Sequence, residues 1–281
     1  MDELTGRVAV VTGGASGIGL AMAERFAAEG MHLAIADIEQ DALDVAAKQL
    51  GDTGVEVLAV RTDVSQADEV DALAERVRDR FGGFHVVCNN AGVGGHGFSS
   101  WDGPVSEWEW VLGVNLWGVI NGIRAFVPTL VEQNEGHVVN TASLAGLTTI
   151  PFMAPYSATK HAVLAISEAL FHELTILGSG VKVSVLCPGF VKTRIAEANR
   201  NWLEHLGPEP AHDDPESAVM EPLIRGLVEA GKPADELAEQ VVDAIRAARF
   251  LVLTEPELSK GAVDSRAAAL EGNDPTLPPL G

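Results

Sequence analysis

Tyr156 and Lys160 stand four residues apart, in the run Tyr-Ser-Ala-Thr-Lys. We expect a helix from Pro155 to Leu177, since proline is tolerated in a first helical turn, and this spacing puts both side chains on one face. A phenol with an ordinary pKa of about 10 is a poor base at neutral pH, but a neighbouring ammonium group stabilises the phenolate. The pair predicts acid–base chemistry on a substrate oxygen. The spacing is common on helices, yet Tyr156 is the only tyrosine of the chain.

A glycine-rich run from Thr12 to Gly19 (TGGASGIG) follows a short apolar run that reads as a strand. Glycines let the backbone approach a pyrophosphate closely, and the N–H groups that begin the next helix point at the anion. The spacing differs from the common G-x-G-x-x-G fingerprint. A dinucleotide site is the favoured interpretation, and a plain strand-to-helix turn is the alternative.

Asp37 closes the next predicted strand, eighteen residues after Gly19. A carboxylate at this place accepts hydrogen bonds from the adenosine ribose hydroxyls and repels a 2′-phosphate. Ser16 and Ile38 occupy the neighbouring positions and supply neither the arginine nor the lysine that an NADP pocket needs. We therefore predict NAD as the cofactor, with NADP and a merely helix-initiating aspartate as the alternatives.

Apolar strand-like runs alternate with helical periodicities along the chain. Strands are expected at 8–11, 32–37, 55–60, 85–89, 136–141 and 181–186. Helices are expected at 18–28, 40–50, 67–81 and 155–177, with another opened by a capping box from Ser106 to Glu109. Runs this apolar belong to strands buried on both faces, and the alternation implies parallel pairing with right-handed crossovers. We predict one α/β domain over residues 1–281, a Rossmann-like doubly wound parallel sheet.

Two regions interrupt this alternation. Residues 190–231 contain four prolines and mixed charge, which predicts a substrate lid of loop and helix. Residues 255–281 form a Pro/Gly-rich tail, for which a loosely ordered terminus and packing on a neighbouring subunit are both open.

Taken in order and at these spacings, the motifs resemble those of the short-chain dehydrogenase/reductase family, over about residues 5–254. The matching stretches are Thr12-Gly13-x-x-x-Gly17-x-Gly19, Asp63-Val64, Asn89-Asn90-Ala91-Gly92, Asn115, Ser143, Tyr156-x-x-x-Lys160 and Pro188-Gly189. The resemblance implies a sheet of about seven strands in the order 3-2-1-4-5-6-7. It also implies an oxidoreductase that transfers a hydride between NAD(H) and a secondary alcohol or ketone.

The resemblance assigns a role to each of four catalytic residues. Tyr156 would exchange a proton with the substrate oxygen, and Ser143 would donate a hydrogen bond to the same oxygen. Lys160 would hold the nicotinamide ribose and lower the pKa of the tyrosine, and Asn115 would position a water that links the lysine to solvent. The simpler alternatives are a strand-end turn serine and a helix asparagine that faces solvent.

The resemblance also implies a set of NAD contacts. Asp63 would contact the adenine, on which Val64 would pack, and Asn90 the inner ribose, although Asn89 to Gly92 alone would read as a turn. Val191 and Thr193 would engage the carboxamide. The implied set is Gly13, Ser16, Gly17, Ile18, Gly19, Asp37, Asp63, Val64, Asn90, Ala91, Gly92, Tyr156, Lys160, Pro188, Gly189, Val191 and Thr193.

The segments expected around the substrate are largely apolar, which predicts a hydrophobic or aromatic secondary alcohol and its ketone. They are Leu144, Leu147, Thr148, Phe152 and Met153, residues 94–101, and Phe190 and Trp202 of the lid. Arg194 is the one arginine there that could hold a carboxylate. An NADP-dependent carbonyl reductase and a non-catalytic dinucleotide-binding protein remain as alternatives.

Composition excludes several other classes of protein. Forty acidic residues against nineteen basic ones, a net charge of −21, argue against nucleic acid and anionic lipid as partners. The eight histidines lack the spacing of a zinc site, so no metal is predicted, and no G-x-S-x-G elbow supports acyl transfer. The two cysteines read as buried thiols of a reducing compartment.

The remaining expectations concern location and assembly. The acidic start of the chain lacks a secretory signal, and the apolar stretch 111–131 contains Asn115, Asn121 and Arg124, which is too polar for a spanning helix. We therefore expect a cytoplasmic protein. Small residues at helical steps permit close helix packing onto the sheet or onto another subunit, and the resemblance favours a homo-oligomer, a dimer or tetramer. These residues are Gly113, Gly118, Gly122, Ala158, Ala162, Ala165 and Ala169.

Overall fold

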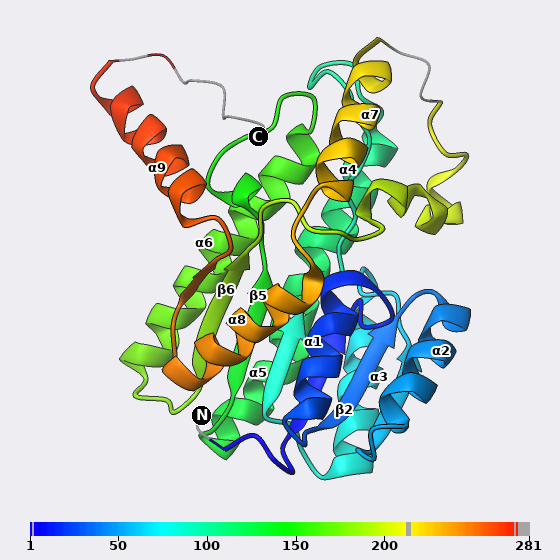
Figure 1. Ribbon diagram of the computed structural model, residues 1–281, viewed down its shortest axis with the longest axis vertical. Coiled ribbons are helices and arrows are strands. Elements are labelled where there is room, and N and C mark those ends of the chain that lie inside the picture. Colours follow the sequence, from blue (N-terminus) through cyan, green and yellow to red (C-terminus); the bar gives the residue numbers. More distant parts are fainter. Residues whose placement is uncertain (2, 212–214, 273, 275–281) are drawn as a thin grey trace.

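A seven-stranded parallel sheet forms the centre of the protein in the computed structural model, which describes residues 1, 3–211, 215–272 and 274. The strands follow the order β3-β2-β1-β4-β5-β6-β7, and every neighbouring pair is parallel (Figure 1). Their bounds are β1 Val8–Thr12, β2 His32–Asp37, β3 Val57–Arg61, β4 Val86–Asn89, β5 His137–Thr141, β6 Lys182–Cys187 and β7 Leu251–Leu253. The predicted fold class and strand order are confirmed.

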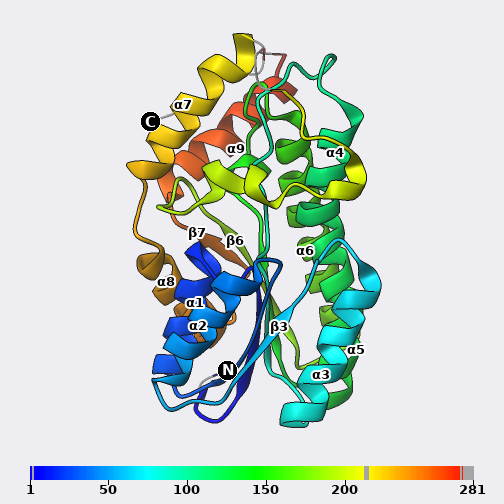
Figure 2. The same cartoon turned by 90° about the vertical axis from the view of Figure 1, so that its right-hand side faces the viewer.

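Helices cover both faces of this sheet (Figure 2). One layer contains α1 (Gly17–Ala28), α2 (Gln40–Gly51) and α8 (Ala234–Ala247), and the other contains α3 (Ala67–Phe81), α5 (Gly118–Gln133) and α6 (Ala154–Ile176). Alternate residues of β1 feed the two cores, since side chains of a strand point to opposite faces: Ala9 and Val11 join one cluster and Val8 and Val10 the other. Burial on both faces explains the continuous apolar strands.

The predicted capping box is wrong. Helix α4 (Val105–Leu112) begins one residue before Ser106, and Pro104 occupies the N-cap position with extended backbone and no side-chain cap. Ser106 therefore lies in the first turn, where its hydroxyl cannot cap the helix. A proline fixes its own φ and disfavours helical backbone in the residue before it. The helix therefore begins directly after Pro104, at Val105.

Helix α4 continues through a five-residue π-helical segment, η1 (Gly113–Trp117), into α5. Within the described residues, the stretch Val105–Gln133 is long and apolar enough to cross a membrane by length and composition. The expectation that Asn115, Asn121 and Arg124 make residues 111–131 too polar for such a helix is therefore wrong. The most apolar window of this stretch is 56% buried inside the protein, as in the core helix of a globular domain. Asn115 and Asn121 are both buried in it.

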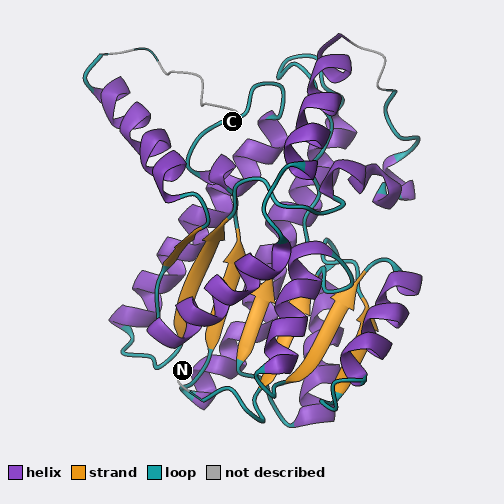
Figure 3. Cartoon of the chain, viewed as in Figure 1, coloured by secondary structure: helices purple, strands orange, loops and turns teal. Residues whose placement is uncertain are grey.

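The strands end at one edge of the sheet, and short elements lie above that edge (Figure 3). They are η2 (Leu144–Gly146) after β5, then η3 (Ile195–Asn201), η4 (Glu204–Leu206) and α7 (Pro215–Glu229) after β6. We refer to residues 190–231 as the lid. Beyond β7, residues 256–270 form a helix, α9 (Pro256–Leu270), so a loosely ordered tail is wrong for that part, while 273 and 275–281 lie outside the described residues.

The small residues of two helices serve different surfaces. A Cβ on Gly118 would lie 2.7 Å from Cγ2 of Val64, and one on Gly122 would lie 1.9 Å from Oδ1 of Asn89. These glycines therefore allow α5 to pack closely on its own chain. By contrast, Ala165 is exposed on α6, as are Ala158 and Ala169. The exposed face of α6 that carries these alanines could pack against another subunit. The homo-oligomer itself stays a prediction.

His137, at the start of β5, is fully buried and makes one hydrogen bond through its ring. Its Nε2 lies 2.7 Å from Oγ of Ser184, and that hydroxyl donates to the carbonyl oxygen of Arg249. The serine must therefore accept from Nε2–H, which leaves Nδ1 as a buried acceptor without a partner among the described residues. Burial lowers the pKa of His137 to about 3.

This histidine predicts a loss of stability in acid. The unfolded chain takes up a proton near pH 6.5 and the folded chain only near pH 3, so the contribution is fully present above pH 6.5 and is lost as the pH falls toward 3. We expect His137→Asn to be less stable than the parent at pH 7 and to approach it at pH 4, measured by urea unfolding. Equal pH slopes for the two proteins between pH 6.5 and 4 would contradict this.

Candidate active site

A cleft of about 380 Å³ opens at the carboxyl end of the sheet, between the turn after β1 and the lid. This volume lies within the range of small-molecule sites, roughly 300–1,000 Å³. All the predicted cofactor residues except Gly19 line it, together with Ser143. Open parallel α/β sheets bind ligands at the carboxyl ends of their strands, at the point where the strand order changes direction and leaves a crevice. In this sheet that point lies between β1 and β4.

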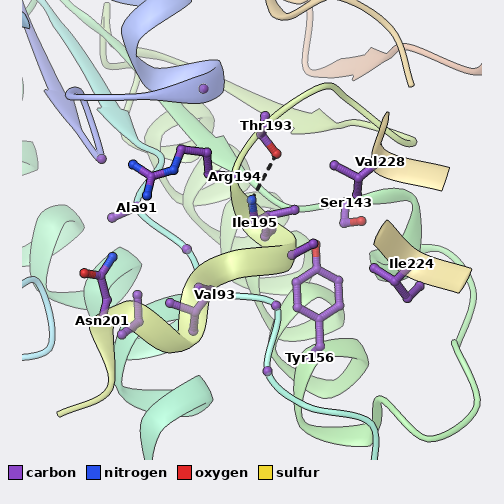
Figure 4. Close-up of a pocket in the computed structure, with 18 of the residues that line it drawn as sticks. Ala91, Val93, Ser143, Tyr156, Thr193, Arg194, Ile195, Asn201, Ile224 and Val228 are labelled. Atoms are coloured by element: carbon purple, nitrogen blue, oxygen red, sulfur yellow. Dashed lines mark hydrogen bonds between the residues drawn. The ribbon is translucent and has the colours of Figure 1, made fainter. Parts of the chain in front are cut away.

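Ser143, Tyr156 and Lys160 converge on the floor of the cleft. Figure 4 shows the Tyr156 hydroxyl directed toward Ser143, and Nζ of Lys160 lies 5.5 Å from the centre of the tyrosine ring. Nζ donates a 3.0 Å hydrogen bond to the carbonyl oxygen of Thr141 at the end of β5. The serine also accepts from the N–H of Ala145, so the turn interpretation and the catalytic interpretation of Ser143 are compatible.

Burial dominates the electrostatics of this pair. It raises the pKa of Tyr156, while the hydrogen-bonding Ser143 acts in the opposite direction. Burial lowers the pKa of Lys160 to about 8. Within the polypeptide alone the phenol is therefore a weaker acid than free tyrosine, and a phenolate requires further positive charge close by.

Asn115 is fully buried in the π-helical segment η1, so the solvent-facing alternative is wrong. Its side chain donates to the carbonyl oxygen of Val93 at 2.9 Å and accepts from the N–H of Val93 at 2.8 Å. A weaker contact joins its Nδ2 to Oγ1 of Thr159, 3.4 Å away on α6. Asn115 thus fixes the loop after β4 against the helix that carries Tyr156 and Lys160.

The glycine-rich turn has the shape that a dinucleotide phosphate requires. Gly13 and Gly17 have left-handed backbone, at φ +64° and +53°, and a Cβ on Gly19 would lie 2.0 Å from the carbonyl oxygen of Gly13. Ser16 occupies the N-cap of α1 without a side-chain hydrogen bond to the first turn. Gly17 and Ile18, which begin α1, line the cleft. The N–H groups of a first helical turn lack partners within the helix, which suits an anion at this place.

Asp37 lines the end of the cleft where the adenosine ribose is predicted, which we refer to as the ribose end. Its carboxylate accepts hydrogen bonds from the N–H groups of Ala15 and Glu39, each at 3.1 Å. Burial raises its pKa, against the effect of these two bonds. The residue therefore joins the glycine-rich turn to β2 as well as lining the cleft.

Two other predicted contacts have structural partners of their own. Nδ2 of Asn90 donates to the carbonyl oxygen of Thr12 at 3.0 Å, and its Oδ1 accepts from the hydroxyl of Thr141. Asp63 accepts from the N–H and hydroxyl of Ser65. Both line the cleft, and their contacts to ribose and adenine remain predictions.

The substrate end differs in part from expectation. Leu144, Thr148, Met153 and Phe190 line the cleft, as do residues 94–97. The lining does not include Leu147, Phe152, Trp101 or Trp202. Trp101 is 86% exposed, whereas Trp202 packs edge-on against Trp110, 5.1 Å between ring centres.

The apolar wall that α7 contributes to the cleft was not predicted from the sequence. Met220, Ile224 and Val228 line the cleft, and Figure 4 shows Ile224 and Val228 beside Ser143. Their spacing of four is the signal that would have identified one face of a helix. The helix is placed by Ser217, whose hydroxyl donates to the carbonyl oxygen of Gly97 at 2.9 Å.

Comparison with known families agrees with this geometry. The family model described as short chain dehydrogenase matches residues 7–204. The chain belongs to the short-chain dehydrogenase/reductase family. It is 43% identical over 197 residues to the 1-deoxy-11-beta-hydroxypentalenate dehydrogenase of Streptomyces exfoliatus, covering 69% of this chain and 71% of that protein.

Solved structures extend the likeness to the whole chain. A short-chain dehydrogenase/reductase from Burkholderia phymatum in complex with NAD is 41% identical and superposes with a TM-score of 0.95 over 99% of both chains. An alcohol dehydrogenase from Thermococcus sibiricus complexed with 5-hydroxy-NADP is 29% identical, with a TM-score of 0.71 over 88% of this chain and 95% of that one. Relatives of this short-chain dehydrogenase/reductase thus bind either type of dinucleotide.

The hydrogen bonds of Asn115 generate a stability prediction for this short-chain dehydrogenase/reductase. Asn115→Leu leaves the N–H and carbonyl of Val93 buried without partners, which costs about 1–3 kcal/mol for each group. Asn121→Leu is a matched control that removes a single bond, to the carbonyl oxygen of Val64. In urea unfolding we expect Asn115→Leu to lose more stability than the control. Equal losses would argue against a stabilising role for the two hydrogen bonds between Asn115 and Val93.

Proposed function

We propose that this protein is an NAD(H)-dependent oxidoreductase that interconverts a hydrophobic secondary alcohol and its ketone. The observation that carries the proposal is the convergence of Ser143, Tyr156 and Lys160 in one cleft with the glycine-rich turn. A binding protein without activity has no need for a buried lysine beside a half-buried phenol, since desolvation disfavours the charged form of each group.

Each side chain has a defined task in this reaction. Bound nicotinamide supplies the redox chemistry by taking a hydride from, or giving one to, the substrate carbon. Tyr156 removes the hydroxyl proton during oxidation and returns it to the carbonyl oxygen during reduction. Ser143 donates a hydrogen bond to that oxygen as negative charge develops on it. Lys160 stabilises the phenolate electrostatically and offers N–H donors to the nicotinamide ribose.

The choice of NAD is supported by the ribose end of the cleft. Asp37 lines this end, where its carboxylate would repel a 2′-phosphate, and one solved structure that is similar to 99% of this chain is a complex with NAD. Ser16 and Ile38 line the same end without positive charge. Fluorescence titration with NADH and NADPH tests the choice, and equal or tighter binding of NADPH would favour the NADP-dependent alternative.

The substrate class is supported by the lining of the other end. Leu144, Ile150, Met153, Phe190 and the α7 wall present mainly hydrocarbon to the cleft. Burial of apolar surface is worth roughly 25 cal/mol per Å², so alcohols with alkyl or aryl groups gain affinity over small polar ones. A panel of secondary alcohols with NAD⁺, followed by the absorbance of NADH, identifies the preferred group.

Tyr156→Phe removes one hydroxyl and tests the assignment of the acid–base group. We expect kcat to fall by about 10²- to 10⁴-fold, because proton transfer then has no donor or acceptor at that position. The Kd for NADH should stay nearly unchanged. Thr175→Ala, which removes an exposed hydroxyl farther along α6, is the control and should keep full activity. Comparable turnover by Tyr156→Phe and the parent would refute the assignment.

Ile224→Asn tests the apolar wall. The polar side chain weakens burial of a bulky substrate, so KM for 1-phenylethanol should rise about tenfold, while KM for 2-propanol changes little. Leu223→Asn is the matched control, since Leu223 is adjacent on α7 and 37% exposed, and does not line the cleft. An equal rise in KM for both alcohols, or for both variants, would contradict the placement of the substrate against this wall.

A further inference from the structure

The lid crosses the cleft and forms an ion pair with the turn after β2. Glu39 accepts hydrogen bonds at Oε1 from Nε of Arg200 and from Nδ2 of Asn201, both at 2.9 Å. Nη2 of Arg200 lies 2.7 Å from the same oxygen, and Nη1 of Arg194 lies 3.9 Å from Oε2. These contacts bridge about 160 positions of sequence, so no local motif announces them.

This ion pair lies at the ribose end of the cleft. Glu39 follows Asp37 by two residues, and its N–H donates to the Asp37 carboxylate. Asp37, Glu39, Arg194, Arg200 and Asn201 all line the cleft. In Figure 4, Arg194 and Asn201 lie on the side of the cleft away from Ser143, Ile224 and Val228.

Opposite charges are balanced at this end. Burial acts to raise the pKa of Glu39, but the hydrogen bonds from Arg200 and Asn201 and the charge of Arg194 outweigh it and lower the pKa, so the carboxylate is ionised. Arg200 also donates through Nη1 to the carbonyl oxygens of Arg194 and Glu197, and Arg194 pairs with the Glu197 carboxylate. The guanidinium groups are therefore held in place.

Guanidinium groups at this position are what a 2′-phosphate needs. Arginine binds phosphate in a bidentate manner, and the sequence positions next to the ribose, 16 and 38, carry no charge. The lid supplies the missing cations from a distant part of the chain. The carboxylates of Asp37 and Glu39, which lie at the same end as these guanidinium groups, make it unfavourable for a doubly charged phosphate.

We propose that Glu39 is a second determinant of cofactor choice, which acts by engaging Arg200 and Arg194 and so withholding them from a 2′-phosphate. The proposal rests on the proposed NAD-dependent function and adds a residue to it. Asp37 repels the phosphate directly, whereas Glu39 neutralises the cations that would attract it. Discrimination against NADP then depends on contact between the lid and β2, not on the ribose turn alone.

Glu39→Gln tests this assignment without relying on turnover. The amide keeps the size of the side chain and removes its charge, so a guanidinium becomes free to pair with the phosphate. Titrations of protein and dinucleotide fluorescence at fixed low salt give Kd for NADH and for NADPH. We expect the ratio of the NADPH to the NADH constant to fall by about tenfold. Adding Arg200→Gln in the same chain should reverse most of that fall.

Glu56→Gln is the matched control. It removes the same charge from an exposed pair with Arg80, beside the amino end of β3, and should leave the ratio unchanged. An unchanged ratio in Glu39→Gln, or a fall that persists in the double variant, overturns the role of the ion pair while wild-type binding of NADH still supports the proposed function. Wild-type protein that binds NADPH more tightly than NADH overturns both. Thermal unfolding of each variant verifies that it is folded.

Discussion

A buried ammonium group is the constraint on which the rest of the site depends. Lys160 is 3% exposed, and the Thr141 carbonyl at the end of β5 is its one hydrogen-bond partner in the described part of the chain. Burying a charge with so few partners is unfavourable and lowers its pKa to about 8. The fold nevertheless holds the lysine there, since α6 is anchored against β5, η2 and the π-helical segment. A buried charge with too few partners is unfavourable for folding, and such features are expected at functional sites, where a bound molecule supplies the missing partners.

The two ends of the cleft rely on different physical forces, and the lid contacts both. At the end near Asp37, Arg200 and Asn201 meet Glu39 through charge and hydrogen bonds. At the other end, α7 lines the cleft mainly with the apolar side chains of Met220, Ile224 and Val228, although Ser217, Glu221 and Arg225 of the same helix also line it. Ser217 fixes α7 to the loop after β4. A molecule bound at either end would contact the same segment, so binding of the proposed cofactor and of the proposed substrate would be linked through the lid.

Six of the seven strands could be predicted from local pattern. The strand order and the expected cofactor residues, all but Gly19 of which line the cleft, followed from the resemblance to the family. Apolar runs mark strands buried on both faces, and glycine is required where the turn after β1 has positive φ. The contacts of the lid could not be predicted from the sequence, because its bonds to Glu39 join residues about 160 positions apart in the chain. Likewise, Pro104 and not Ser106 occupies the N-cap position of α4, and α9 forms in a tail whose composition suggested no helix. Competing local signals of similar strength are decided only by tertiary packing.

Asn115 shows how a functional group can depart from helical periodicity. A π-helical turn adds one residue to the regular repeat, so the face that a side chain occupies shifts for the five residues of η1. The regular repeat would leave its orientation undetermined, and an exposed polar position was a reasonable interpretation of the sequence. In the fold, the π-turn directs the amide inward, where it pairs with both backbone groups of Val93. A single amide in the irregular turn thus couples the loop after β4 to α6, through both backbone groups of Val93 and Oγ1 of Thr159.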